Sequence, residues 1–316
     1  MPNKIVQAIA EVYRHQYRSY GDYSVTTLLS PPREVQLCRR HADEIEVRPE
    51  KMVASMIGTA THEYIEKMLR LANMIHPEWE LERSVYDSFE IEPGVRRLVA
   101  GRFDILENGK HLHDNKVVNV WKVIFDPDME EWTQQQNLYA YLLHRRGVDV
   151  ESLTINAWFK DWKEGNAVRD RSYPQNQTIE YQLPLWSWEE SEAFLMDRLT
   201  FHYSCEKVDD KNLPVCTAEE RWERFDDQTH VHYAIFKDPK AKRAHRVIKT
   251  TFDDAVDYLK KWKGRTSESF IEERFPIPRK CIKYCDAAPF CSWFQMWKQR
   301  NDEGQVNQIH PAKYLC

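Results

Sequence analysis

The sequence predicts an α/β fold in which a mixed central sheet is flanked by helices. Residues 101–118 have the pattern of two short strands joined by a turn, 132–143 that of a helix, and 151–160 that of an alternating strand. This order of elements is typical of α/β proteins. The 316 residues are 42% hydrophobic and 30% charged, which fits a globular chain of one large or two small domains.

The hairpin at 101–118 carries the candidate chemistry, and its loop length decides its geometry. An Asn-Gly pair marks the turn, because both residues tolerate positive φ. A two-residue loop would place Asp104 opposite His113, with Asp114 facing away. A three-residue loop would pair Asp104 with Asp114, on the face that also carries Lys116. We expect the longer loop, because a divalent cation would remove the repulsion between the carboxylates.

Helical patterns flank this hairpin on both sides. Upstream, residues 50–76 show apolar residues at helical spacing, and His62, a common type of metal ligand, lies on a different face. Downstream, Gln135 and Tyr139 are one helical turn apart. An isolated Asp…Asp-x-Lys pattern most often marks a solvated hairpin, so the prediction of a metal site depends on the three segments together.

The order Gly-x-x-x-His, Gly-x-x-Asp, Asp-x-Lys and Gln-x-x-x-Tyr, from Gly58 to Tyr139, resembles the motifs of PD-(D/E)XK nucleases. The subgroup it is similar to is the RecB-type nuclease domain, together with CRISPR-associated iron–sulfur exonucleases and phage-encoded exonucleases. The resemblance implies a restriction-endonuclease-like core with a C-terminal cysteine-cluster extension. It also implies a phage or bacterial metal-dependent DNA exonuclease for recombination, repair or end processing. A selective endonuclease and a non-catalytic module that binds DNA or a partner remain the alternatives.

The resemblance also implies a role for each motif residue. Four groups would ligate Mg²⁺ or Mn²⁺: His62, Asp104, Asp114 and the backbone carbonyl of Asn115. Lys116 would position the attacking water, Gln135 would hold Lys116 or a phosphate, and Tyr139 would support the DNA side of the site.

The rest of the chain suggests three parts: an N-terminal helical segment (1–50), the nuclease core (51–200) and a C-terminal extension (201–316). Further helices are expected over 4–20, 33–46, 187–202 and 252–262. Further strands are expected over 81–91 and 179–183, and a loop or flap over 161–177.

The C-terminal extension has a basic stretch, in which strands over 231–236 and 244–249 flank a charged turn. Its basic side chains are Lys237, Lys240, Lys242, Arg243 and Arg246. A ridge that contacts DNA phosphates and a solvated hairpin tip explain this pattern equally well.

Cys281, Cys285 and Cys291 form the second chemical signal. Three close cysteines in a chain without a secretion signal favour a metal over disulfides. The resemblance implies a [4Fe–4S] cluster, and Zn²⁺ is the alternative. We prefer Cys216 as the fourth ligand, because its Leu-Pro-x-Cys-Thr context is similar to that of phage PD-(D/E)XK proteins. Cys38, the other candidate, lies in an apolar helical context where a buried thiol is ordinary.

The net charge of −5 argues against a protein that coats DNA, although a local basic groove is sufficient for a nuclease. The chain has no apolar run that would span a bilayer, and its start is too polar for a signal peptide, so we expect a cytoplasmic protein. The expected partners are single- or double-stranded DNA ends and a recombination or single-strand annealing protein.

Overall fold

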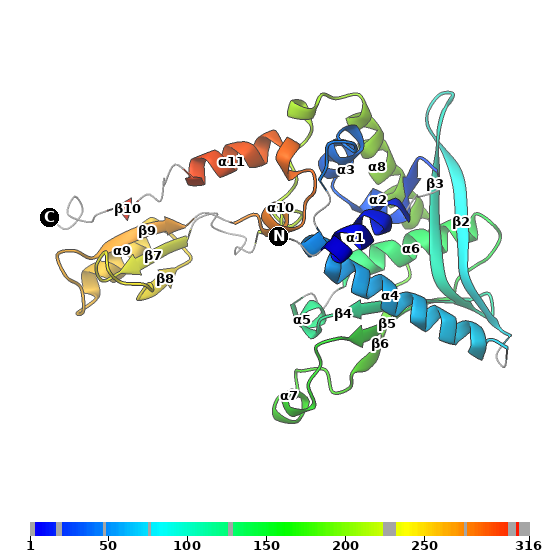
Figure 1. Cartoon of the computed structure of the whole chain (residues 1–316), viewed down its shortest axis with the longest axis horizontal. Helices are drawn as coiled ribbons and strands as arrows, with labels where there is room; N and C mark the ends of the chain where they lie inside the picture. The colour runs from blue at the N-terminus through cyan, green and yellow to red at the C-terminus, as the bar shows by residue number, and fades with distance from the viewer. Residues whose placement is uncertain are drawn as a thin grey trace. The chain divides into compact units, whose positions relative to one another are not determined.

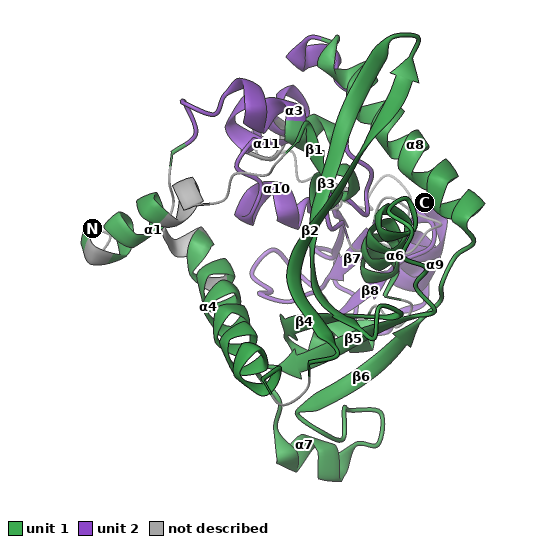
Figure 2. Ribbon diagram, turned by 90° about the vertical axis from the view of Figure 1, so that its right-hand side faces the viewer, with its two compact units in different colours: residues 1–35, 46–208 green, residues 36–45, 209–316 purple. Residues whose placement is uncertain are grey.

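The computed structural model describes residues 4–16, 21–46, 49–74, 77–125, 129–223, 232–274, 277–302 and 308–309. The chain forms two compact units (Figures 1 and 2). Unit 1 comprises Met1–Val35 and Glu46–Val208, and unit 2 comprises Gln36–Ile45 and Asp209–Cys316. The expected N-terminal segment is therefore divided between the two units, and the C-terminal part of unit 2 begins after Val208, where the sequence predicted a boundary after residue 200.

Helices and strands are interspersed along the chain. The α-helices are α1 (Lys4–Gln16), α2 (Val25–Leu29), α3 (Pro32–Arg40), α4 (Pro49–Ala72), α5 (Val120–Phe125), α6 (Glu130–His144), α7 (Glu164–Arg169), α8 (Trp188–Glu206), α9 (Phe252–Lys261), α10 (Arg279–Lys283) and α11 (Ser292–Asp302). The strands are β1 (Tyr23–Ser24), β2 (Trp79–Glu92), β3 (Val95–Glu107), β4 (His111–Val118), β5 (Ser152–Phe159), β6 (Thr178–Leu183), β7 (His232–Phe236), β8 (Arg246–Ile248), β9 (Phe270–Arg274) and β10 (Gln308–Ile309). Two 3₁₀ turns are η1 (Asp210–Asn212) and η2 (Ala288–Phe290).

Unit 1 is built on a six-stranded mixed sheet with the order β1-β3-β4-β5-β6, in which β2 also pairs with β3. Strand β4 is antiparallel to β3 and parallel to β5. Parallel neighbours need a crossover, and the crossover contains α6, the helix predicted to carry Gln135. Helices flank the sheet, with α4 on one side and α6 on the other (Figure 2). The predicted α/β class with a mixed sheet is confirmed.

Burial of apolar side chains explains why α6 lies against the sheet. Leu138 and Leu142 of α6 are fully buried, as are Leu112 of β4 and Leu153 and Ile155 of β5, all in one core cluster. Strands that are covered on both faces are apolar along most of their length. The same packing fixes the position of the polar first turns of α6.

Unit 2 contains an antiparallel sheet with the order β10-β9-β7-β8. Helix α9 packs on it through Ala255 and Leu259, which share a buried cluster with Ile235 and Ile271. The two strands expected around the basic turn correspond to β7 and β8, and residue 231 lies outside the described residues.

One local expectation needs correction, because the segment 161–177 contains a short helix, α7, in addition to loop. After β4 the chain turns into the short helix α5. Strand β9 was not expected from the sequence. Of the helix expected over 4–20, residues 17–20 lie outside the described part, as do 75 and 76 beyond α4. No helix among the described residues is long and apolar enough to cross a membrane.

Candidate metal centre

The β3–β4 hairpin has the three-residue loop that the chemistry favours. Glu107 pairs with His111, so the same register, continued along the strands, places Asp104 opposite Asp114. The ladder ends at Ile105, one step before the two acidic residues. The prediction of the longer loop is confirmed.

Where the β3–β4 ladder ends, a side chain in place of a backbone carbonyl accepts the hydrogen bond of a strand amide. The amide of Asn115 donates to Asp104 Oδ2 at 2.8 Å. The side chain of Asn115 accepts from Trp158 Nε1 at 3.2 Å. The side chains of Asp104 and Asp114 are 11% and 5% exposed, so two acidic groups are buried next to one another. The Asn115 carbonyl stays a predicted ligand.

Lys116 lies between Asp114 and the crossover helix. Its Nζ is 2.8 Å from Asp114 Oδ2 and donates to Gln135 Oε1 at 2.9 Å. The contact with Asp114 is an ion pair without hydrogen-bond geometry, and this buried oxygen has no hydrogen-bond partner. A buried carboxylate oxygen with an unused lone pair is the donor that a hard divalent cation prefers.

Tyr139 supports this arrangement from inside the core. Gln135 Nε2 donates to the Tyr139 hydroxyl at 3.2 Å. The Tyr139 side chain is 5% exposed, and its ring packs so closely on Gly101 that a Cβ there would lie 2.9 Å from Cδ1 and closer still to Cε1. Burial raises the pKa of Tyr139, so the phenol stays protonated. Tyr139 therefore contacts the site through Gln135, and its role on the DNA side stays a prediction.

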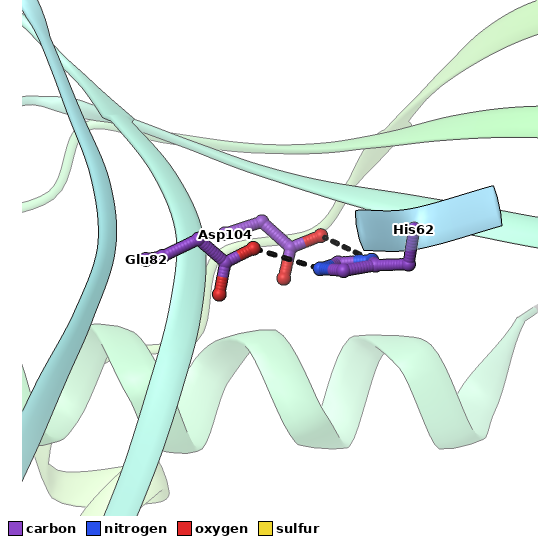
Figure 3. Close-up of side chains that lie close together, drawn as sticks. All are labelled: His62, Glu82 and Asp104. Carbon is purple, nitrogen blue, oxygen red and sulfur yellow. Dashed lines mark hydrogen bonds and ion pairs between the residues drawn. The ribbon is translucent and has the colours of Figure 1, made fainter. Parts of the chain in front are cut away.

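His62 projects from α4 between two carboxylates (Figure 3). Its Nε2 is 2.7 Å from Glu82 Oε1, and its Nδ1 is 3.7 Å from Asp104 Oδ2. In the described part of the chain, His62, Glu82 and Asp104 are the one group of three potential ligands whose atoms lie within 4.8 Å of one another. Asp114, which faces Lys116, is not part of that group.

The electrostatics of the group indicate an excess of negative charge. The hydrogen bond to Glu82 raises the pKa of His62, with smaller contributions from Asp104. Burial, and then the nearby Asp114, raises the pKa of Asp104. Both shifts mean that the site favours a positive charge, either a proton or a cation.

Glu82 is the member of the site that was not expected. It lies on β2 with a left-handed φ of 52°, and its side chain is 7% exposed. Its second oxygen, Oε2, is 2.7 Å from Nε of Arg102. The sequence signal was the position of Glu82 in the strand that precedes the hairpin.

In unit 2, the segment that carries Cys216 lies against the cysteine triplet. The amide of Lys280 donates to the carbonyl of Arg221 at 3.1 Å. Arg221 in turn donates to the carbonyl of Cys216, and its guanidinium lies 4.3 Å from the ring centre of Trp293. Cys216 is thereby connected to both sides of the triplet.

Cys38 also lies near the triplet. His41, one helical turn further along the chain, stacks on Phe290 with 4.1 Å between ring centres. Phe290 directly precedes Cys291, which is buried, as is Cys285. The six described cysteines are thiols, not disulfides. Both candidates for the fourth ligand therefore belong to the same unit as the triplet.

The five basic residues of the extension belong to the β7–β8 hairpin. Lys237, Lys240, Lys242 and Arg243 lie on its connection and Arg246 begins β8, and all five are exposed. Arg246 lies over the ring of Tyr258, with 5.2 Å to the ring centre.

Comparisons with known proteins add little. No protein-family model matches the chain, and a search of curated proteins gives no match. One solved structure, the crystal structure of SSO0001, is similar at 13% identity over 66% of this chain and 88% of that chain. Its TM-score of 0.45 is too low to support an argument.

Proposed function

We propose that unit 1 is a PD-(D/E)XK nuclease core that hydrolyses DNA phosphodiester bonds with Mg²⁺ or Mn²⁺, and that it acts on DNA ends. One observation carries the proposal. The hairpin register sets Asp104 opposite Asp114, on strands whose ladder ends one step earlier, with Lys116 and His62 beside them. Separate segments of the chain, far apart in sequence, thus contribute the residue types that metal-dependent phosphoryl transfer requires.

The donor set fits a hard divalent cation. Asp104, Asp114 and His62 would bind it, and the buried oxygen of Asp114 that lacks a hydrogen bond supports this fit. When bound, the ion would supply Lewis-acid stabilisation of phosphate charge and a more acidic water. Buried carboxylates attract a cation more strongly than exposed ones, because water screens their charge less.

Lys116 would orient the attacking water. An ammonium group has three N–H donors. The hydrogen bond to Gln135 directs one of them, and the ion pair with Asp114 holds the group beside the carboxylates. A remaining N–H would donate to a water or a phosphate oxygen. Gln135, itself held by Tyr139, would keep Lys116 aligned, so Gln135 and Tyr139 are positioning residues.

Unit 2 would contribute a cluster and a DNA contact. We propose that Cys281, Cys285, Cys291 and Cys216 bind a [4Fe–4S] cluster with a structural role, since phosphodiester hydrolysis needs no electron transfer. The exposed basic residues of the β7–β8 hairpin would contact phosphates. A recombination or annealing protein is the proposed partner.

The test is cleavage of labelled DNA by protein purified without oxygen. Linear single- and double-stranded DNA labelled at one end would be compared with closed circular DNA, in the presence of Mg²⁺ or Mn²⁺. Lys116→Ala is the test variant. Lys110→Ala is the matched control, because Lys110 lies in the loop of the same hairpin and its side chain is 55% exposed in a surface ion pair with Glu151.

The expected result is metal-dependent loss of linear DNA that Lys116→Ala abolishes and Lys110→Ala preserves. Cleavage of circular DNA would show that the same core acts as an endonuclease and not as an exonuclease. Binding of DNA without cleavage under every metal condition would refute the hydrolytic function.

A further inference from the structure

Glu82 has a role that the motif residues do not cover. We infer that Glu82 is a positioning residue that fixes the His62 imidazole so that Nδ1, and not Nε2, faces the catalytic cation. The inference rests on the proposed metal site. It specifies which nitrogen of His62 binds the cation, and it names Glu82 as the group that determines this choice.

The first step is the hydrogen bond between Glu82 and His62. Its length of 2.7 Å from Nε2 to Oε1 is typical of a charge-assisted bond. A carboxylate has no proton to donate, so Nε2 carries the hydrogen. In a neutral imidazole the other nitrogen, Nδ1, then has the free lone pair that a metal needs.

The second step is the distance on the other side of the ring. Two ligands that bind one Mg²⁺ at about 2.0–2.1 Å lie about 2.9 Å apart when adjacent and about 4.2 Å apart when opposite. The 3.7 Å between Nδ1 and Asp104 Oδ2 falls within this interval. The 2.7 Å between Nε2 and Glu82 Oε1 is a hydrogen-bond length and is shorter than the spacing of ligands around such an ion.

The third step concerns the oxygens of Glu82. Oε1 contacts His62 and Oε2 lies 2.7 Å from Nε of Arg102. Both oxygens of Glu82 are therefore engaged by protein groups. Glu82 is accordingly a supporting carboxylate behind the metal-binding histidine, an arrangement that recurs in metal sites.

The backbone of Glu82 supports a specific role. A left-handed φ of 52° is disfavoured for a residue with a long side chain. The flanking residues Leu81 and Arg83 keep regular pairing with Ile105 and Phe103. Local strain of this kind persists where surrounding contacts enforce it and is common at functional sites.

The test reads the ring nitrogen directly. The full chain, with isotope-labelled histidine, is loaded with the NMR-active isotope of cadmium in place of Mn²⁺, and the metal–nitrogen coupling shows which nitrogen binds. Absence of the coupled signal in His62→Gln assigns it to His62. We expect coupling to Nδ1. Coupling to Nε2, or no coupling, would overturn the inference.

Manganese titrations of Glu82 variants give a second readout. Glu82→Leu removes the acceptor and should weaken Mn²⁺ binding by about 10- to 100-fold. Glu82→Gln keeps an acceptor oxygen and should weaken it by less than about tenfold. Glu80→Gln is the matched control on the same strand, since Glu80 is 42% exposed in a surface pair with Arg83, and it should leave the affinity unchanged.

The outcomes separate this inference from the proposed function. A loss in Glu82→Gln as large as that in Asp104→Asn would make Glu82 a direct ligand and overturn the inference, while the nuclease proposal would stand. Should Glu82→Leu fail to fold, the cadmium coupling of the wild-type chain and the Glu82→Gln affinity still decide. An absence of any metal binding would refute both.

Discussion

Gly101 is the point at which a single added methyl group should disturb both the fold and the site. In Gly101→Ala the new Cβ would lie 2.9 Å from Tyr139 Cδ1, closer still to Cε1, and 3.1 Å from Val25 Cγ2. Carbon atoms in good contact are about 3.5–4.0 Å apart, so the buried ring must move by about 1 Å. Overpacking of this kind costs about 1–3 kcal/mol, and loss of the Tyr139–Gln135 hydrogen bond would add about 1 kcal/mol.

We therefore expect Gly101→Ala to lower the free energy of unfolding by about 2–4 kcal/mol, measured by urea denaturation. Metal-dependent cleavage should fall as well, because Gln135 no longer aligns Lys116. Gly58→Ala is the matched control: Gly58 lies within α4 and a Cβ there meets nothing within 4 Å, so this change should be neutral or stabilising by up to about 1 kcal/mol. Equal stability of Gly101→Ala and wild type would refute the packing argument.

Three further predictions concern the two units. Burial raises the pKa of Asp104 to about 7, and a hydrogen bond raises the pKa of His62. Because a bound metal must displace these protons, the affinity for Mn²⁺, measured by calorimetry, should fall at least about tenfold from pH 8 to pH 6. The same shift means that the contribution of Asp104 to metal-free stability is greatest below its ordinary pKa and is lost as the pH rises through about 7, and a flat affinity profile would contradict this assignment. Cys216→Ala should bleach the visible absorbance of the anaerobic protein and Cys38→Ala should not; the reverse result would make Cys38 the fourth ligand. Lys242→Glu should weaken DNA binding and reduce its salt dependence, and unchanged binding would leave the basic hairpin as a solvated tip.

The sequence was most informative where structure depends on local chemistry. The Asn-Gly turn and the alternation of Asp114 and Lys116 are properties of neighbouring residues, and they led to the correct hairpin register. The crossover helix was predictable for the same reason, since its apolar spacing and its position between two strands are both local. The capping box of Ser187 and Glu190 at the start of α8 is a further example.

Glu82 was missed because its position depends on an irregularity that has no clear sequence signature. The tight turn between β2 and β3 pairs Glu92 with Val95. If that register continued along both strands without interruption, Arg83 would lie opposite Asp104. A bulge near the turn shifts the pairing by one residue, which brings Glu82 to that position. The burial of Tyr139 was not predictable either, because one helix pattern fits both a buried and an exposed tyrosine.

The most direct test of the metal centre is anomalous diffraction from crystals of the protein soaked in Mn²⁺. We predict a peak in contact with Asp104, Asp114 and His62, with Glu82 behind the histidine. A peak elsewhere, or none at this site under conditions in which the protein cleaves DNA, would contradict the central claim that these residues form the catalytic metal site.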